Sequence, residues 1–243
     1  MEILITNDDG ISSKLILLLF NKLTKLGHNV IVCAPDKNNS CISQAIRYWE
    51  YEDNHLTKVS EFMYSHPGTP ADGINYYLKE FNKLPDLVIS GINNGLNAGV
   101  DVQYSGTIGA ASEAINMNIP AIAISSEVDY DEDVVNKGLD IIFDKVFKHQ
   151  LYSKDFIYSF NIPHVINYDK IVVAPLNSGI DIDEPKYEFL SKFNHIDKQY
   201  YHNNIGKNTD LYFLYKGIIT VTPIVVDRTD YKNMSKIANF FDK

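Results

Sequence analysis

Residues 2–36 read EILITNDDGISSKLILLLFNKLTKLGHNVIVCAPD, and this stretch decides the fold. The apolar run at 2–6 ends in Asn-Asp-Asp-Gly, which predicts a buried strand followed by a tight loop. Leucines between Leu15 and Leu26 recur at helical spacing, with Ser12 or Ser13 as the candidate N-cap. A second apolar strand follows at 29–34. Strand, helix and strand in this order predict the βαβ unit of a parallel sheet.

The remaining chain continues with apolar strands and amphipathic helices. Up to residue 150 we expect strands at 86–90 and 121–125, helices at 69–81, 107–117 and 131–147, and two less regular strands within 46–65. Beyond residue 150 we expect strands at 156–162, 171–174, 211–215 and 218–222, and a last helix at about 231–241. The prediction is an α/β protein with a parallel-sheet core, a β-rich C-terminal part and a terminal helix.

The composition is that of an ordinary globular protein, and it excludes several classes. Apolar residues make up 45% and charged residues 22% of the 243-residue chain, unlike a disordered, collagen-like or coiled-coil protein. The net charge of -9 argues against a basic groove for a nucleic-acid polymer. No apolar run reaches the roughly 18 residues of a membrane span, and the first residues lack the pattern of a signal peptide. We therefore expect a cytoplasmic protein that binds neither nucleic-acid polymers nor membranes.

Polar loops follow three of the predicted strands, at 7–10, 35–40 and 91–97. In a parallel sheet these loops share one edge, where ligands bind. Asp8 and Asp9 come directly after the first strand, and two carboxylates held together there repel unless a cation joins them. An adjacent acidic pair is more commonly a solvated surface pair. The interpretation as a cation site therefore depends on the position of this pair directly after a buried strand.

The other polar side chains at this edge are oxygen donors, namely Ser40, Asn93 and Asn97. Carboxylate, hydroxyl and amide oxygens suit Mg²⁺ or Mn²⁺ better than zinc. The two cysteines, Cys33 and Cys41, form no CxxC pair, and the histidines are scattered. Taken singly, the serine and the asparagines are ordinary turn residues. Taken together at one sheet edge, they make a metal site as reasonable an interpretation as a set of turns.

Ser105-Gly106-Thr107 opens the helix predicted at 107–117 and supplies a possible phosphate-binding element. Its hydroxyls and the free N–H groups of a helix N-terminus attract anions, although a simple helix cap has the same sequence. The chain has no Walker A motif, no GxGxxG after the first strand and no GxSxG. These absences argue against a P-loop, a dinucleotide cofactor and a serine hydrolase.

Five short motifs occur in order along the chain, namely NDDG at 7–10, APDxNxS at 34–40, SGIN-x-G-x-N at 90–97, YSGT at 104–107 and PxxVD at 223–227. Together they resemble the motifs of the SurE family of survival proteins. The resemblance implies a metal-dependent 5′-nucleotidase that acts on nucleoside monophosphates or other phosphomonoesters. It also implies a Rossmann-like core and homodimers or homotetramers formed through a C-terminal arm.

Carried over by motif, the roles fall on particular residues of this chain. The resemblance implies metal ligands at Asp8, Asp9, Ser40 and Asn93, phosphate contacts at Asn97, Ser105, Gly106 and Thr107, and catalytic roles for Asp8 and Asn97. Cys41 stands where the family usually has glycine, Leu96 where it usually has proline, and Ser12-Ser13-Lys14 where it has a small turn. These departures concern loop geometry and substrate preference more than the ligand chemistry.

Two questions of mechanism stay open at the level of sequence. Asp8 can orient or deprotonate a water, or it can attack phosphorus and form an aspartyl-phosphate. A metal-dependent nucleotide- or phosphate-binding module with little turnover would use the same site. Release of inorganic phosphate from AMP or GMP, with Mn²⁺ and with EDTA, separates an enzyme from such a module.

We expect residues 1–243 to form a single domain with an oligomerisation arm at about 183–222. Residues 183–208 are polar and irregular but rich in tyrosine and phenylalanine. Such a segment has no core of its own in which to bury aromatic groups, which carry much of the contact energy of interfaces. We therefore expect the aromatic groups to dock on a partner subunit.

Overall fold

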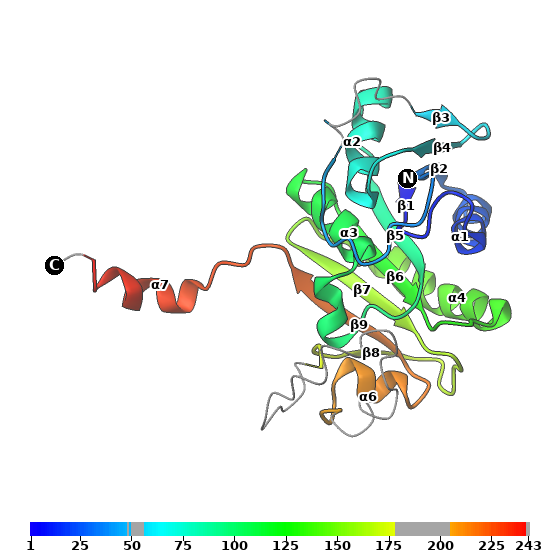
Figure 1. The fold of residues 1–243 in the computed structure, drawn as a ribbon. Helices are drawn as coiled ribbons and strands as arrows, with labels where there is room; N and C mark the ends of the chain where they lie inside the picture. The colour runs from blue at the N-terminus through cyan, green and yellow to red at the C-terminus, as the bar shows by residue number, and fades with distance from the viewer. Residues whose placement is uncertain (48, 50–55, 178–204, 242–243) are drawn as a thin grey trace, which may run out of the picture.

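The computed structural model describes residues 1–47, 49, 56–177 and 205–241 (Figure 1). Within these residues, nine strands form one mixed sheet in the order β3-β4-β2-β1-β5-β6-β7-β9-β8. The strands are β1 (Glu2–Thr6), β2 (Asn29–Pro35), β3 (Thr57–Lys58), β4 (Met63–His66), β5 (Leu87–Asn94), β6 (Ala121–Ser126), β7 (Phe156–Ile162), β8 (Ile171–Val173) and β9 (Ile219–Val225). Pairing is parallel from β4 to β7, whereas β3 and β9 run antiparallel to β4 and β7.

Helices pack on both faces of this sheet, while the last helix stands apart from it (Figure 1). They are α1 (Lys14–Lys25), α2 (Pro70–Phe81), α3 (Gly106–Asn116), α4 (Glu132–His149), α6 (Asp210–Leu214) and α7 (Tyr231–Ala238), with a 3-10 turn η2 at Gly99–Gln103. The α/β class predicted from the sequence is confirmed. Among the described residues, no helix is long and apolar enough to cross a membrane.

Strand β1 divides the sheet and thereby fixes where a ligand can bind. It pairs with β2 on one side and with β5 on the other. The chain builds outward from β1 through β2 to β4 and then crosses back to β5. At such a reversal of strand order, the loops after the two central strands separate and leave a crevice at the carboxyl edge of the sheet. Here those are the loops after β1 and β5, which carry Asp8, Asp9 and Asn97.

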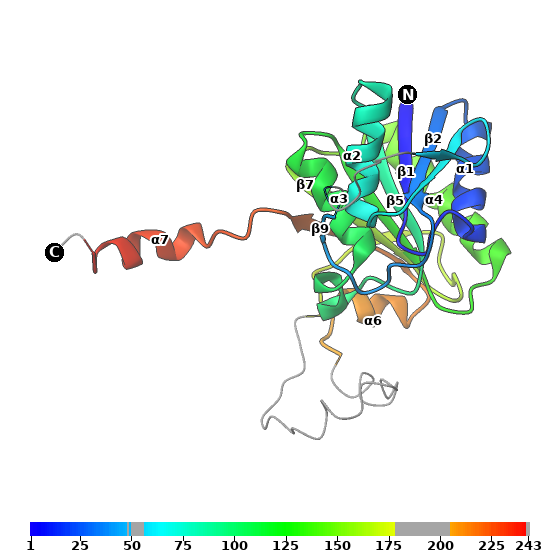
Figure 2. The same ribbon diagram turned by 45° about the horizontal axis from the view of Figure 1, so that its top comes forward.

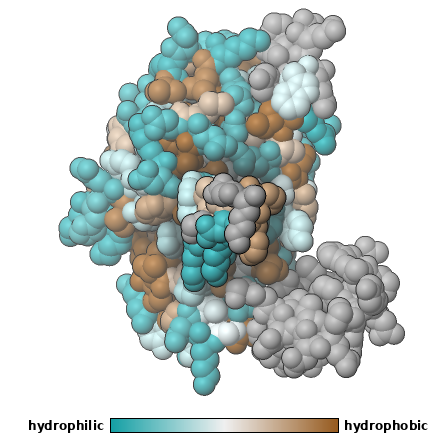
Figure 3. Space-filling model, turned by 90° about the vertical axis from the view of Figure 1, so that its left-hand side faces the viewer, coloured by the Kyte–Doolittle hydropathy of each residue, from teal (hydrophilic) through white to brown (hydrophobic). Residues whose placement is uncertain are grey.

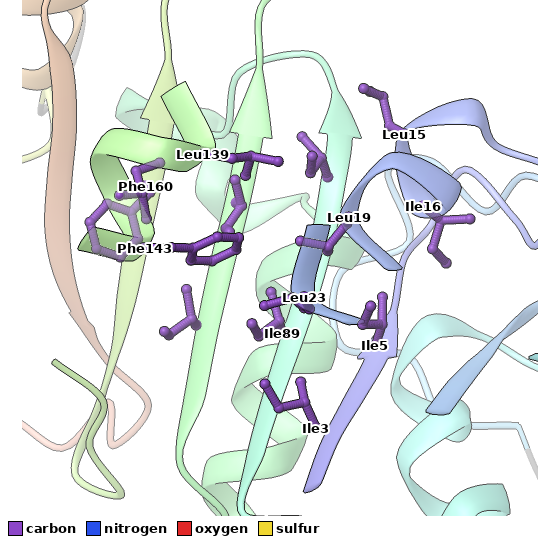
Figure 4. Close-up of a cluster of buried hydrophobic side chains, with 14 of the residues drawn as sticks. Ile3, Ile5, Leu15, Ile16, Leu19, Leu23, Ile89, Leu139, Phe143 and Phe160 are labelled. Atoms are coloured by element: carbon purple, nitrogen blue, oxygen red, sulfur yellow. The ribbon is translucent and has the colours of Figure 1, made fainter. Parts of the chain in front are cut away.

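Alternating side chains of β1 pack into two hydrophobic cores, one on each face of the sheet. Ile3 and Ile5 point into the cluster beneath α1 and α4 (Figure 4), and Leu4 points into the cluster beneath α2 and α3. Ser13 occupies the N-cap position of α1, but its side chain makes no capping hydrogen bond. A cap contributes about 0.5–2 kcal/mol, whereas each buried leucine or isoleucine contributes about 1.5–3 kcal/mol. The buried apolar face of α1 therefore accounts for most of its stabilisation.

Helix α2 begins as its sequence predicts. Thr69 is the N-cap, Pro70 holds the first helical position, and Thr69 and Asp72 form a capping box. At the other end Asn82 adopts a left-handed conformation. Local signals at both ends thus agree with the burial of the helix, and the prediction for 69–81 is confirmed.

The expected strand at 211–215 is wrong, because these residues lie mainly in helix α6. Tyrosine and phenylalanine favour strands by propensity. In the structure Leu211 and Leu214, three residues apart, are both buried against Ala98. This packing needs one helical face, so tertiary contact overrides propensity. Of the strands expected within 46–65, the short β3 and β4 are present.

The expected arm at 183–222 falls partly outside the described residues, at 183–204. Its last residues, 219–222, belong to β9 inside the sheet, so they are not part of a separate arm. Among the described residues, helix α7 at the C-terminal end stands apart from the sheet in two views (Figures 1 and 2). Figure 3 looks onto the face from which α7 projects, where apolar residues are interspersed with polar ones.

Candidate active site

The loop after β1 presents two adjacent carboxylates at the crevice. Asn7 shapes this loop, because its side chain accepts a hydrogen bond from Gly10 N and donates one to Gly10 O, each at 3.1 Å. The Asn7 side chain is thereby committed to the turn, and Asp8 and Asp9 are the carboxylates that face other elements. Asp8 is only 3% exposed, and Asp9 is half-buried.

Asp8 contacts the N-terminus of α3 directly. Thr107 Oγ1 donates to Asp8 Oδ1 at 2.8 Å. The approach is close because residue 106 is glycine: a Cβ at that position would lie 2.9 Å from Asp8 Cβ. The YSGT motif and the NDDG motif, almost a hundred residues apart in sequence, therefore meet in one buried contact.

Asp9 joins the other two polar loops. Its carboxylate accepts from Asn94 N at 3.0 Å and from Asn38 Nδ2 at 3.4 Å. Asn39 N also donates to the main-chain oxygen of Asp8 at 2.7 Å. The predicted convergence of the three loops at one sheet edge is therefore present.

Burial makes ionisation of the acidic pair unfavourable. Desolvation, together with the nearby charge of Asp9, raises the pKa of Asp8 from 3.8 to about 6, against the opposing effect of the Thr107 hydrogen bond. Burial also raises the pKa of Asp9. A bound cation would offset both effects, because it stabilises the ionised carboxylates.

The oxygen atoms that the neighbouring loops offer are of the kind that a hard cation prefers. Asn93 donates its side-chain N–H to Gly95 O at 2.7 Å, so its oxygen is the remaining acceptor. Ser40 is exposed, and its N–H donates to Asn38 Oδ1 at 2.9 Å. No group of three or more His, Cys, Asp or Glu side chains that could hold a metal occurs in the described part of the chain. A metal at this edge must therefore combine the acidic pair with neutral oxygens, which suits Mg²⁺ or Mn²⁺.

The N-terminus of α3 combines a cap with N–H groups that have no acceptor inside the helix. Ser105 Oγ accepts from Ile108 N at 3.0 Å, so this serine is the N-cap. The N–H groups of Gly106 and Thr107 precede Ile108 in the first turn, where a helix has no internal acceptors. They are suited to an anion beside Asp8.

Asn97 is held rigidly by residues that the sequence analysis did not identify. The Asn161 side chain of β7 accepts from Asn97 N and donates to Asn97 O, both at 2.9 Å. Asn97 Nδ2 donates to Ser125 Oγ of β6 at 2.7 Å. Asn161 and Ser125 are fully buried polar residues at the ends of apolar strands, and that is the only signal their sequence offers.

A family model described as Survival protein SurE matches residues 3–179. The chain belongs to the SurE family. The resemblance drawn from its motifs is thereby confirmed. A curated "5'-nucleotidase SurE" of Clostridium botulinum (strain Eklund 17B / Type B) is 35% identical, with 100% of both chains covered. A protein of the same name from Campylobacter jejuni is 36% identical over 97% of this chain and 96% of its own. The crystal structure of the SurE protein from Aquifex aeolicus superposes with a TM-score of 0.81 at 29% identity, over 100% of both chains.

Two departures from the usual SurE motifs change the loops in which they lie. Cys41, at the position usually held by glycine, has a φ of 60°, in the left-handed region that glycine favours. Leu96, at the position usually held by proline, packs against the cluster of Ala98, Leu211 and Leu214. The first change places a strained residue next to Ser40, and the second adds apolar contact next to Asn97.

Proposed function

We propose that this SurE chain is a metal-dependent 5′-nucleotidase that hydrolyses nucleoside 5′-monophosphates to nucleoside and phosphate. The observation that carries the proposal is the Asp8–Thr107 contact of 2.8 Å. It joins an acidic pair suited to a cation with a helix N-terminus suited to a phosphate. The names of the curated relatives support the same activity.

The proposed cation is Mg²⁺ or Mn²⁺, with Asp8, Asp9, Ser40 and Asn93 as the residues that would hold it. When bound, it would supply Lewis-acid stabilisation of a phosphoryl oxygen and activation of water. The chain's own carboxylates carry about two negative charges, and a phosphomonoester carries nearly two more. The acidic pair alone would therefore repel the substrate, which is the physical reason to expect a strict requirement for the cation.

The remaining site residues would bind and orient the phosphate. The N–H groups of Gly106 and Thr107 and the side chain of Asn97 are the donors proposed to face its oxygens. Thr107 donates its hydroxyl hydrogen to Asp8, and its backbone N–H also hydrogen-bonds that carboxylate, so a phosphate would compete with Asp8 for these donors. Ser105 contributes indirectly, because its hydroxyl caps the helix and keeps these donors in place.

Asp8 would move the proton in this scheme. With the cation bound the rise in the pKa of Asp8 would be offset, so the carboxylate would be ionised near pH 7 and could accept a proton from water. The competing route, in which Asp8 attacks phosphorus, predicts a covalent aspartyl-phosphate. Trapping with hydroxylamine during turnover separates the two routes, because only the acyl phosphate reacts.

The function is tested by release of inorganic phosphate from AMP and GMP, with Mn²⁺ and with EDTA. We expect metal-dependent turnover that is lost in Asp9→Asn and retained in Asp169→Asn, a matched change at an exposed residue paired with Lys137. A nucleotide-binding module, the second candidate, would bind AMP in the presence of metal without releasing phosphate. Full turnover by metal-free protein would contradict both.

We further propose that the chain assembles as a homodimer or homotetramer through its C-terminal segment. Tyr231, Met234 and Ile237 recur every three residues on α7 and are 67%, 51% and 55% exposed. Phe240 and Phe241, just beyond α7, are more than 80% exposed. An apolar face of this kind on a helix that stands away from its own body is suited to packing on a second copy. The cytoplasmic location expected from the sequence stays a prediction.

A further inference from the structure

Asp210 is a fully buried carboxylate that lies outside the acidic pair of the crevice. It is the first residue of α6, and its carboxylate accepts three backbone hydrogen bonds. Gly99 N donates to Asp210 Oδ2 at 2.7 Å, while Asn177 N and Leu211 N donate to Oδ1, each at 2.8 Å. One side chain thus joins α6, the segment after β8 and the loop that carries Asn97.

The contact with Gly99 lies two residues beyond Asn97 in sequence. Gly99 has a φ of +56°, and a Cβ there would lie 3.2 Å from Asn177 O, so the loop fits closely against the segment after β8. Leu211 and Leu214 of α6 pack on Ala98, between the two. The loop is therefore fixed at residue 97 by Asn161 and at residue 99 by Asp210.

We propose that Asp210 is a positioning residue for substrate binding, which acts by holding Gly99 and thereby the orientation of Asn97. This inference rests on the proposed role of Asn97 in phosphate binding. Asp210 lies beyond the part of the chain, 3–179, that the SurE family model matches. The C-terminal part of the chain would therefore contribute to the geometry of the substrate site without touching the substrate.

The division of donors between the two carboxylate oxygens makes the idea testable. Asp210→Asn can keep its one carbonyl oxygen where Asn177 N and Leu211 N donate. Its amide group then faces Gly99 N, so two donors meet and the bond to the Asn97 loop is lost. The contacts to Asn177 and Leu211 remain. The variant thus separates the support of the loop from the support of α6.

A second variant controls for loss of stability. Leu214→Ala weakens the packing of α6 on Ala98 but leaves the Asp210 carboxylate and its bond to Gly99 in place. We expect it to lower the melting temperature without changing substrate affinity. Asp169→Asn, at an exposed residue, controls for the change of charge.

The experiment measures the affinity for inorganic phosphate by calorimetry with Mg²⁺ present, the affinity for Mn²⁺ by electron paramagnetic resonance, and the KM and kcat for AMP. For Asp210→Asn we expect phosphate affinity to fall and KM to rise by about 10- to 100-fold, the range that the loss of an outer partner of a metal ligand produces. Affinity for Mn²⁺ should stay at the wild-type value. Wild-type phosphate affinity in Asp210→Asn, or an equal rise in KM in Leu214→Ala, would overturn the proposal.

Two further outcomes are separable. If the wild type binds phosphate but releases none from AMP, the nucleotidase proposal fails. The phosphate affinity of Asp210→Asn still tests the positioning role of Asp210. If Asp210→Asn does not fold, hydrogen exchange of the wild type decides. The amide of Gly99 should then be protected together with those of Asn177 and Leu211. Free exchange at Gly99 would overturn the proposal.

Discussion

Replacing Asp8 with asparagine should stabilise the protein in chelator, although it removes a central residue of the site. Burial raises the pKa of this carboxyl from 3.8 to about 6, so at pH 7 the folded protein must hold a charge that the unfolded chain solvates better. At 1.36 kcal/mol per pKa unit, the difference corresponds to about 3 kcal/mol. Asparagine keeps an oxygen that can accept from Thr107 and carries no charge. Asp8→Asn should therefore gain up to about 3 kcal/mol at pH 7.

The pH dependence has a definite sign. Between pH 3.8 and about 6 the folded protein binds more protons at Asp8 than the unfolded chain does. The free energy of unfolding contributed by this group therefore falls as pH rises through that window. Urea unfolding in EDTA at several pH values should show this fall in the wild type and a smaller one in Asp8→Asn.

Adding metal should reverse the order of the two proteins. A cation that binds only the folded state stabilises it by about 4.1 kcal/mol at a concentration one thousand times its Kd, which exceeds the difference of about 3 kcal/mol between the two proteins. The wild type should gain this stabilisation with Mn²⁺, and Asp8→Asn should gain little. If Asp8→Asn were less stable than the wild type in EDTA at pH 7, the unfavourable burial of the Asp8 charge would be refuted.

Three further predictions address the supporting structure. Gly106→Ala should cost about 1–3 kcal/mol of stability and reduce turnover of AMP, because the new Cβ would lie 2.9 Å from Asp8 Cβ. Retained activity would show that the loop after β1 can move to accommodate the added methyl group. Asp72→Asn should lower the urea midpoint by an amount equivalent to about 1–3 kcal/mol, because the Asp72 carboxylate accepts from Thr69 N and Arg47 N. Ending the chain after Asp227 should shift the particle mass measured by light scattering toward the monomer, and an unchanged mass would exclude α7 from the interface.

The sequence predicts the central fold well because local and tertiary signals agree there. In β1 the alternation of Ile3, Leu4 and Ile5 matches two separate cores, and α2 carries its own start signal. Helix α6 was missed because its tyrosine and phenylalanine side chains favour a strand by propensity. Its helical form depends on Ala98, more than a hundred residues earlier in the chain.

The candidate site divides in the same way. The motifs contain Asp8, Asp9 and Thr107. Their positions after parallel strands are enough to indicate that these residues converge at one edge of the sheet. Asn161 and Asp210 are single polar residues beside apolar runs, and they give no local sign of the loop that they hold. Only the folded chain reveals their partners. The aromatic residues expected to form an arm at 183–204 lie outside the described residues, so that prediction stays untested.

The central claim is that one buried contact, Asp8 with Thr107, couples a cation site to a phosphate site. The most direct measurement is the affinity of the wild type for inorganic phosphate, by calorimetry, with Mg²⁺ and with EDTA. Without the cation the acidic pair repels the anion, so we predict at least about a tenfold gain in affinity with Mg²⁺, equivalent to about 1.4 kcal/mol of coupling. Equal phosphate affinity in both conditions would contradict the claim.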